Sequence, residues 1–526
     1  MDIIENEKKK RTILYGLLVT VLVLIGVTYA YYRITKTQTN SNVIGTRTCL
    51  NTTLTEETSE IVLSDAFPIS DEDGLKQSPF TFTLTNNCDS YVKVTIALVS
   101  EYRTSTNTAY LKDNYVKSNL STKGTNDGSS VILSTLSLGE VDTNTQGYVL
   151  KTTGLKNKEA KSFDLRLWLD SKTTNEQGLN KTWKGKIVVS VVAAEYVPTF
   201  AETILAKNEV KAPITTPGAA VSTASEALLA STEDDYGTSY YFRGAVTNNY
   251  VEFANKCWRI VRVGGDGSVK LILHNDNPTG VANPCDAANN SASAAFARYS
   301  GETYKSAFNT NYNDNAYVGF KYGTVGASGY DATHANTNKS TILTNLETWY
   351  TNNLKTYESV IDDNVWCNDK TNVTDTTFNP YNYSNVNGLG YAKNVTYYGA
   401  TQRLVGTSGS AGGTGPSLKC NGELSKINSK VGLITADELA LAGYAYGLQN
   451  STTYLQENAT DTYWWSLSPY FFYGAGASVW YVIGSNGYFG GNYVFLTYGV
   501  RPSISLKSTT NVTGNGTSDS PFIIST

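Results

Sequence analysis

Apolar and polar residues alternate with a period of two between residues 43 and 196. A strand with this pattern buries one face and exposes the other, so the alternation restricts this region to antiparallel β-structure. The stretch "FTFTLT" places Phe80, Phe82 and Leu84 on one face. After a polar turn, a second stretch also has one apolar face: Val92, Val94, Ile96 and Leu98. We expect the two stretches to pair as a hairpin within an Ig-like β-sandwich, most simply a spacer without its own ligand.

The length and composition of the chain limit its class. A chain of 526 residues is too long for one ordinary core, which predicts two or three domains. Runs of Val, Ile, Tyr and Thr broken by Gly and Asn predict a mostly β protein with an α+β C-terminal domain. The net charge is −4, and the only basic cluster is near the N-terminus, which argues against nucleic acid as the main partner.

The N-terminus predicts a membrane anchor. A basic flank, Lys8 to Arg11, precedes an uncharged and mostly apolar stretch at residues 12–32, which is long enough to cross a bilayer as a helix. Because basic flanks stay cytoplasmic, residues 1–11 form the expected cytoplasmic tail and the later domains lie outside the cell. Two alternatives remain: an export signal cleaved after Ala30, which gives a secreted protein, and a buried core helix.

Six cysteines are present, and an even number in an exported chain indicates disulfides. Their spacing lacks the CxxC or CxxH pattern of a metal site. Order along the chain suggests the pairs Cys49–Cys88, Cys257–Cys285 and Cys367–Cys420, although sequence does not fix connectivity and free buried thiols are the alternative.

A change in composition marks the domain boundary. Residues 197–235 are rich in Pro, Ala, Thr and Ser, and we expect a linker with at most a short helix. Residues 236–526 then form a second domain with several strands and two helices. The first helix is predicted by apolar residues at helical spacing: Ile342, Leu346, Trp349 and Tyr350. The second begins with a capping box, Thr435 to Glu438, and is expected to stop near Gly447.

The segment from Tyr470 to Tyr498 combines eleven aromatic residues with Gly, Ser and Asn, and it contains no charged residue. Tyr and Phe offer a large contact area for few rotatable bonds, and Tyr hydroxyls add directional hydrogen bonds. Charged side chains would add a desolvation cost to binding. The segment therefore predicts a binding face. Because strands alternate, about half of these rings are expected to point into the core.

Two resemblances extend this interpretation. The motifs "LRLWLD" and "GLNKTWKGKIVVSV" behind an anchor resemble the exported sandwich domains of camelysin-type and biofilm-matrix proteins of Gram-positive bacteria. The order "DTYWWSLSP", "VWYVIGSNGYF" and "GVRPSISL" resembles the C-type-lectin fold, in the branch that holds formylglycine-generating enzymes and the variable proteins of diversity-generating retroelements. This resemblance covers residues 236–526. It implies paired terminal strands, a binding face of long loops and, in some members, trimers.

The resemblance to variable proteins can be examined through the genetic code. Such retroelements alter adenines, typically in Asn codons, and these changes cannot yield Trp, Met, Lys, Gln or Glu. Within residues 466–506 only Trp480 belongs to that excluded set. A diversified segment at 466–506 is therefore one interpretation, and a fixed-sequence relative of the same fold is the other.

The expected roles of individual residues follow from these patterns. Three tryptophans and the "VRP" motif are expected to form the scaffold, with Arg501 holding the final strand through hydrogen bonds: Trp464, Trp465, Trp480, Arg501 and Pro502. The candidate ligand contacts are Tyr470, Phe471, Phe472, Tyr473, Tyr481, Ile483, Tyr488, Phe489, Asn492, Tyr493, Phe495 and Tyr498.

Catalysis and cofactors have little support in the sequence. The two histidines, His274 and His334, have no partner motif for a triad or a zinc site. The reactive cysteine pair of formylglycine-generating enzymes has no counterpart, because no cysteine follows Cys420. The stretch "WCNDK" at residues 366–370 resembles the Trp-Asn-Asp calcium motif of sugar-binding lectins, but Cys367 interrupts it. No cofactor is expected, with a structural calcium ion as the alternative.

We therefore expect a single-pass, membrane-anchored surface protein that binds a protein or glycan on another cell, a phage or a host surface. The alternatives are a matrix or pilus-like protein that self-associates, including as a homo-oligomer, and a carbohydrate-active or oxidising enzyme. Sequence does not name the ligand.

Overall fold

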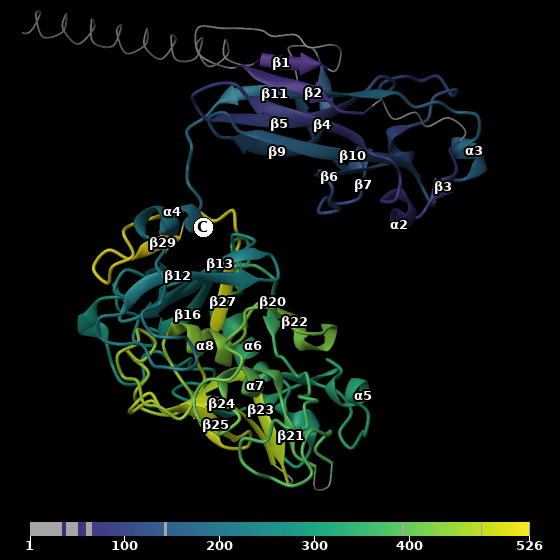
Figure 1. Cartoon of the computed structure of the whole chain (residues 1–526). Helices are drawn as coiled ribbons and strands as arrows, with labels where there is room; N and C mark the ends of the chain where they lie inside the picture. The colour runs from purple at the N-terminus through teal and green to yellow at the C-terminus, as the bar shows by residue number, and fades with distance from the viewer. Residues whose placement is uncertain are drawn as a thin grey trace, which may run out of the picture. The chain divides into compact units, whose positions relative to one another are not determined.

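The computed structural model describes the following residues: 34–37, 51–58, 66–140, 145–391, 394–474 and 476–524. The chain divides into two compact units, Met1–Val197 and Pro198–Thr526 (Figure 1). Both units are built mainly of strands, so the mostly β prediction is confirmed. The expected cytoplasmic tail (1–11) and membrane segment (12–32) lie outside the described residues. Among the helices within the described ranges, none has the length and apolar character needed to cross a membrane.

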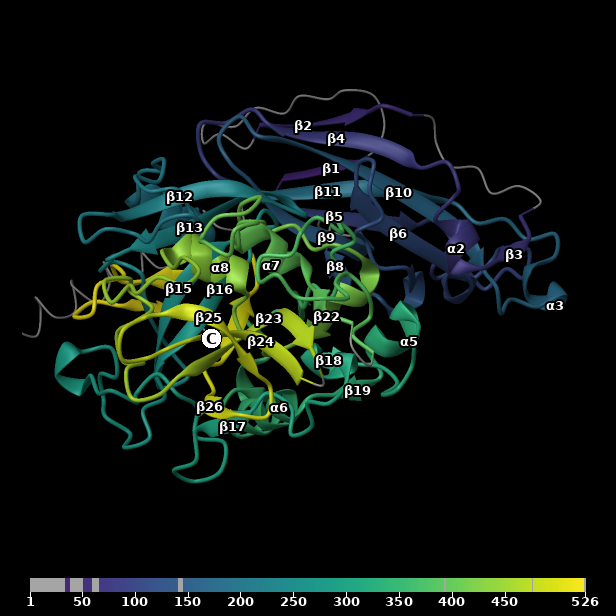
Figure 2. The same cartoon turned by 60° about the horizontal axis from the view of Figure 1, so that its bottom comes forward.

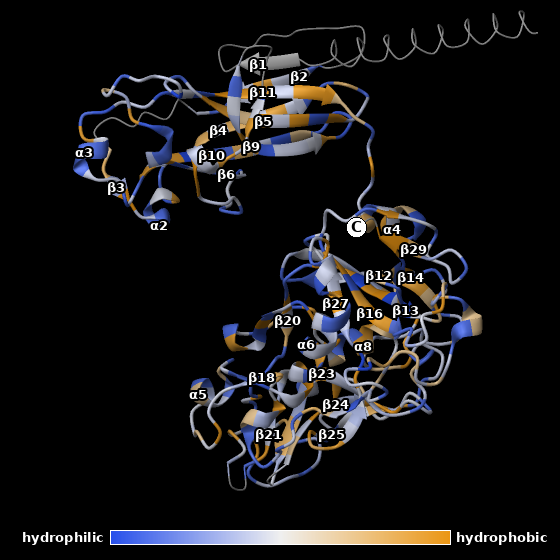
Figure 3. Ribbon diagram, turned by 180° about the vertical axis from the view of Figure 1, so that it is seen from behind, coloured by the Kyte–Doolittle hydropathy of each residue, from blue (hydrophilic) through white to orange (hydrophobic). Residues whose placement is uncertain are grey.

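The first unit is a sandwich of two sheets around one core (Figure 1). One sheet has the order β1 (Ile34–Thr37), β11 (Gly185–Ala193), β5 (Val92–Ser100), β9 (Gln146–Leu155) and β8 (Leu138–Glu140). The other has the order β2 (Thr52–Glu56), β4 (Phe80–Asn86), β10 (Ala160–Asp170), β6 (Val116–Thr122) and β7 (Val131–Ile132), with β3 (Pro68–Ile69) beside β10. The short helices α2 (Asp71–Gly74) and α3 (Asn175–Gly178) are hydrophilic (Figure 3). The sandwich begins at Ile34, before the expected residue 43.

The expected hairpin between β4 and β5 is wrong. These strands belong to different sheets, because β4 pairs with β2 and β10, whereas β5 pairs with β11 and β9. Phe82 and Val94, one from each strand, are both fully buried in the core between the sheets. Alternation identified the buried face of each strand correctly. It could not identify the pairing partner, since strands facing each other across a sandwich have the same pattern as strands paired side by side.

The second unit contains two main sheets. The larger sheet has the path β12 (Ala227–Asp234), β13 (Gly237–Gly244), β15 (Lys256–Val263), β14 (Tyr250–Phe253), β29 (Phe522–Ile524) and β28 (Val512–Thr513), with β16 (Val269–Asn275) joining β15 to β27 (Ser503–Leu506). The smaller sheet has the order β17 (Lys305–Ala307), β26 (Thr497–Gly499), β23 (Trp464–Tyr473), β24 (Gly476–Val482) and β25 (Phe489–Tyr493), with β21 (Thr396–Tyr397) beside β23 (Figure 2). Two short ribbons complete the strands: β18 (Lys321–Tyr322) with β19 (Asn338–Lys339), and β20 (Asn364–Cys367) with β22 (Lys426–Ser429).

Helices cover the sheets of the second unit: α5 (Tyr330–His334), α6 (Thr341–Asn353), α7 (Gly399–Leu404) and α8 (Ala436–Ala442). Helix α6 buries the four apolar residues that predicted it. Helix α8 begins at the predicted capping box, in which Thr435 and Glu438 bond each other's backbone N–H. It ends at Gly443, whose positive φ of 128° closes the helix earlier than expected.

The segment expected as a linker, residues 197–235, belongs to the second unit from Pro198 on. It forms helix α4 (Phe200–Lys207), which buries Phe200 and Ile204 in the main core, and strand β12 along the edge of the larger sheet. The sequence did not predict strand β12, because both of its faces are covered. Leu229 packs into the main core while Leu228 and Ala230 pack into a second cluster, so the strand shows no alternation.

The two ends of the second unit meet. The Phe200 N–H donates to the Thr510 carbonyl at 2.7 Å, and the ring of Phe200 lies edge-on to Phe522 with 5.2 Å between centroids. Strand β29 also pairs with β14. The first helix and the last strand of the unit are therefore held together, and β29 lies between β14 and β28 in the larger sheet.

Candidate ligand-binding surface

The aromatic segment contributes to four neighbouring strands, β26, β23, β24 and β25 (Figure 2). Some glycines of this segment lie in strands, where the missing side chain leaves space for a neighbouring aromatic ring. A Cβ on Gly491 would lie 1.8 Å from the ring of Tyr470, and a Cβ on Gly476 would lie 2.2 Å from the ring of Tyr493. Glycine is required at both positions because a neighbouring aromatic side chain fills the space.

Four of the twelve candidate contacts are buried and are not surface residues: Tyr470, Phe472, Tyr481 and Phe489. The ring of Trp480, itself fully buried, lies 4.9 Å from Tyr470 and 4.6 Å from Phe489. Strand β24 is buried along its whole length and β23 is buried except near its end, so successive side chains on both faces of these strands are covered. These four rings form part of the scaffold with Trp464, Trp465 and Trp480, all of which are buried.

The remaining candidates reach the surface. Three rings are exposed, namely Tyr473 at 42%, Tyr493 at 39% and Phe495 at 39%. Five further candidates are half-buried: Phe471, Ile483, Tyr488, Asn492 and Tyr498.

Two tyrosines outside the aromatic segment join the exposed rings. Tyr383 stacks on Tyr473 with 4.2 Å between ring centroids, and Tyr312 lies 4.5 Å from Phe495. Phe495 in turn lies 5.9 Å from Tyr493. We call this set the aromatic strip: Tyr312, Tyr383, Tyr473, Tyr493 and Phe495. Sequence reasoning missed Tyr312 and Tyr383, although their settings "NYND" and "YNYSN" also interleave Tyr with Asn.

A triangle of tyrosine hydroxyls supports one end of the strip. The hydroxyls of Tyr381 and Tyr446 are 3.0 Å apart, those of Tyr470 and Tyr446 are 3.2 Å apart, and Tyr381 also bonds Tyr470. Burial, followed by the neighbouring hydroxyls, raises the pKa of Tyr470 well above its usual value, so the Tyr470 hydroxyl keeps its proton at physiological pH. The triangle attaches a long segment to strand β23. This segment runs between Cys367 and Cys420 and contains Tyr383, and we call it the excursion.

A second group of rings lies beside Trp465. Tyr498 is 4.5 Å from Trp465, 5.0 Å from Tyr463 and 5.7 Å from Tyr481 between ring centroids. The Asn492 side-chain amide donates to the Tyr498 hydroxyl at 2.9 Å. Tyr463 is 37% exposed, so this group adds aromatic surface next to the same strands.

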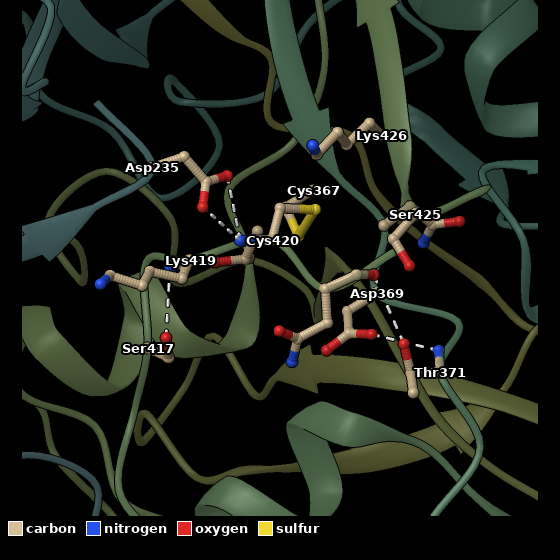
Figure 4. The surroundings of a disulfide bond; sticks show 12 residues. Asp235, Cys367, Asp369, Thr371, Ser417, Lys419, Cys420, Ser425 and Lys426 are labelled. Carbon is tan, nitrogen blue, oxygen red and sulfur yellow. Dashed lines mark hydrogen bonds between the residues drawn. A yellow bond between two sulfur atoms is a disulfide. The ribbon is translucent and has the colours of Figure 1, made fainter. Parts of the chain in front are cut away.

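A charged cavity of about 40 Å³ lies next to the Cys367–Cys420 disulfide. Figure 4 shows Asp235 on one side of this disulfide and Asp369 on the other. Asp235 accepts the Cys420 N–H at 3.2 Å, and Asp369 pairs with Arg403 at 2.7 Å.

Ion pairs hold most of the other charges of this cavity. Arg403 also pairs with Asp437 at 2.7 Å, while Glu438 pairs with Lys270 at 2.7 Å and with Arg262 at 3.0 Å. Burial alone would raise the pKa of Glu438, but Lys270 and Arg262 lower it to about 2. Each cation of the cavity is thus paired with a carboxylate, which fits a structural role better than proton transfer.

The disulfides match the predicted order where both cysteines are described, namely Cys257–Cys285 and Cys367–Cys420. Cys88 is also disulfide-bonded, and its expected partner Cys49 lies outside the described residues. The two bridges within the second unit indicate that the domain folds in an oxidising environment.

The residues considered for catalysis or metal binding are buried. Burial, followed by Arg259, lowers the pKa of His274 well below its usual value, and burial, followed by Lys370, lowers that of His334 to about 3. In "WCNDK", Asn368 donates to the Leu467 carbonyl and accepts the Phe320 N–H. Across the described part of the chain, no group of three or more His, Cys, Asp or Glu residues is arranged so that it could hold a metal ion.

Comparisons with protein-family models, curated proteins and solved structures find no match to this chain.

Proposed function

We propose that this protein is a ligand-binding or adhesion protein displayed on a bacterial cell surface, and that the aromatic strip is its binding face. The observation that carries the proposal is the exposure of Tyr473 and Tyr493 at the ends of β23 and β25, and of Phe495 in the turn that follows, beside rings that are mostly buried. Exposed apolar surface lowers the solubility of a protein, so large apolar patches are uncommon where they serve no function. Clustered exposed rings mark interaction sites.

The chemistry of the strip supports broad recognition. Tyr473 and Tyr493 end strands of the sheet, and Tyr383 and Phe495 pack on them, so little side-chain entropy is lost on binding. The tyrosine hydroxyls supply hydrogen bonds at the edge of an apolar contact. The absence of charge between Tyr470 and Tyr498 removes the desolvation cost that a charged face would carry.

The rest of the chain is assigned to display. In this proposal residues 12–32 anchor the protein in the membrane and the β-sandwich acts as a spacer. The two disulfides of the second unit support a location outside the cytoplasm. The C-type-lectin-like identity of the second unit and diversification of residues 466–506 are part of the same proposal.

Binding can be tested on the full chain with defined probes. The wild-type protein is screened against an array of immobilised glycans and a displayed peptide library. A triple variant, Tyr473→Ser with Tyr493→Ser and Phe495→Ser, should lose the binding that wild type shows. The matched control is Tyr236→Ser, because Tyr236 is 59% exposed and lies outside the strip.

The outcome separates the proposal from its main alternative. Equal binding by wild type and the triple variant would remove the strip from the binding face. A wild-type protein that binds no probe but whose sedimentation coefficient rises with concentration, in a manner abolished by the triple variant, would instead identify a self-associating matrix protein.

A further inference from the structure

Two disulfides of the second unit differ in how far the fold covers them. Cys257 is 0% exposed and Cys285 is 1% exposed, and both pack against the buried Tyr250. Cys367 and Cys420 are each half-buried, and both line the charged cavity. Thiol–disulfide exchange requires that a thiolate reach a sulfur atom. A small thiol can therefore approach the Cys367–Cys420 bridge through the cavity, whereas the fold covers the other bridge.

Other contacts hold the backbone on both sides of the Cys367–Cys420 bridge. Cys367 ends strand β20, where it pairs with Lys426 of β22. The Cys420 N–H donates to Asp235 at 3.2 Å (Figure 4). Because these contacts do not involve sulfur, the bridge can open while the strands stay paired. Exchange at this bridge then needs no unfolding of the surrounding structure.

The wall of the cavity is acidic overall. Its carboxylates outnumber its cations by six to three: Asp234, Asp235, Asp266, Asp369, Asp437 and Glu438 against Arg262, Lys270 and Arg403. Two of the carboxylates, Asp235 and Asp266, are exposed. They accept hydrogen bonds from neutral donors, the Cys420 N–H at 3.2 Å and the Ser268 N–H at 2.9 Å. Their negative charges therefore face whatever enters the cavity from solvent.

Two lysines lie near the bridge without lining the cavity. Figure 4 shows Lys419 and Lys426 beside the disulfide. Lys426 pairs with Glu423 at 2.9 Å, and Lys419 is exposed. A cleft whose walls carry mainly one sign of charge concentrates reagents of the opposite sign. The route through the cavity therefore favours a cationic reagent over an anionic one.

We propose that the Cys367–Cys420 bridge is a thiol-exchange site that reacts in the folded protein, with small cationic aminothiols as its preferred reagents. The thiolate of the reagent attacks one cysteine sulfur and the S–S bond breaks. A mixed disulfide forms, and the other cysteine leaves as a thiolate and takes a proton from water. A second reagent thiolate attacks the mixed disulfide, which yields two cysteine thiols and the oxidised reagent. Reduction removes the covalent closure of the excursion and leaves the Cys257–Cys285 bridge intact.

The first test compares the two bridges within one molecule. The full chain is treated with cysteamine, samples are alkylated with iodoacetamide at intervals, and peptide mass spectrometry measures the label on each cysteine. Cys367 and Cys420 should become labelled at least about tenfold faster than Cys257 and Cys285, because the buried pair reacts only after the protein opens. Equal rates for the two bridges, or labelling of Cys367 and Cys420 only in urea, would overturn the proposal.

The second test measures the preference for charge. Reduction of the Cys367–Cys420 bridge by cysteamine is compared with reduction by 2-mercaptoethanesulfonate at low ionic strength. Each rate is divided by the rate of the same reagent with hydroxyethyl disulfide, which removes differences in intrinsic reactivity. The corrected rate should be about threefold or more higher for cysteamine, and salt at about 0.5 M should reduce this ratio. A ratio of one at low ionic strength contradicts the proposal.

A pair of substitutions ties the preference to the cavity. A double variant, Asp235→Asn with Asp266→Asn, keeps both side-chain oxygens as acceptors and removes two negative charges. It should lower the ratio of the corrected rates while the bridge remains reducible. Asp519→Asn is the matched control, because Asp519 is exposed and does not line the cavity, and it should keep the wild-type ratio. The same ratio in the double variant and the control would overturn the assignment.

Discussion

The ring of Tyr383 stacks on the ring of Tyr473, with 4.2 Å between centroids and 20° between planes. The two residues come from segments far apart in the sequence. Tyr473 ends strand β23, and Tyr383 belongs to the excursion between Cys367 and Cys420. The proposed binding face therefore depends on how this excursion is held against the sheet.

A double-mutant cycle on this pair should show coupling. Tyr383→Ala and Tyr473→Ala should each weaken binding of the probe identified in the screen, and the double variant should lose less than the sum of the single losses. An aromatic pair contributes about 0.5–1.5 kcal/mol beyond its buried area, which sets the expected coupling energy. Titration calorimetry measures it. Strict additivity would show that the two rings act independently.

Removing the Cys367–Cys420 disulfide should weaken binding as well as stability. The sequence separation is 53 residues, and a loop of that length corresponds to roughly 4 kcal/mol in the chain-entropy description. A Cys367→Ser, Cys420→Ser variant should therefore unfold at lower denaturant and bind its probe less tightly.

The Cys257–Cys285 bridge provides the control, since its separation is 28 residues and it lies outside the excursion. The corresponding double Ser variant should lose stability but keep its probe affinity at a temperature where it is folded. Equal loss of affinity in both variants would mean that the excursion has no special part in binding.

Gly491→Ala should destabilise the second unit. The added Cβ would meet the ring of Tyr470 at 1.8 Å, and overpacking of this kind costs about 1–3 kcal/mol. Gly329→Ala is the matched control, because nothing lies within 4 Å of its added Cβ and its φ is −97°. Urea denaturation compares the two. A Gly491→Ala protein as stable as wild type would show that Tyr470 moves aside freely.

Acid should weaken the second unit through Glu438. The pKa of this carboxyl is about 2 in the folded protein against 4.5 for an ordinary Glu, so the unfolded chain takes up the proton first as pH falls. The stabilisation is fully present above pH 4.5 and is lost between pH 4.5 and 2. At about 1.4 kcal/mol per pKa unit it amounts to roughly 3 kcal/mol.

Denaturation curves over this pH range give the test. Glu438→Gln should flatten the acid dependence of unfolding, whereas Glu302→Gln, at an exposed carboxylate, should leave the wild-type slope unchanged. An unchanged slope in Glu438→Gln would show that Lys270 and Arg262 do not stabilise the charged form.

If residues 466–506 are diversified, the pattern of variation should follow exposure. Differences between natural copies should fall on positions such as Tyr473, Tyr493 and Phe495, while Gly491 and the buried Phe489 stay constant. Sequencing this segment across individual genomes, together with any near-copy beside a reverse-transcriptase gene, provides the measurement. Variation concentrated at buried positions would contradict the proposal.

The sequence predicted local structure better than it predicted which distant strands pair. The helix that carries Trp349, the capping box at Thr435 and two disulfides depend on nearby residues or on chain order, and the structure contains them. The pairing of β4 depends on residues far along the chain, and its two neighbours were not predictable from its own pattern.

The binding surface was harder to predict for a similar reason. Phe489 and Phe495 are both aromatic residues among Gly and Asn, yet one is fully buried and the other is 39% exposed. Phe489 begins strand β25 and is covered by the rest of the domain, whereas Phe495 lies in the turn after that strand, and the local sequence pattern does not contain this information. Tyr383 shows the converse case, since its role depends on a ring contributed by β23.

The contact between Phe200 and Phe522 has a practical consequence for engineering. Because the N- and C-terminal ends of the second unit are in contact, the unit can be inserted into an exposed loop of an unrelated carrier protein without separating the two ends of that loop. New termini could likewise be opened elsewhere after a short bridge joins the old ones. The module is in this sense portable, and its rings could be presented on a scaffold of the experimenter's choice.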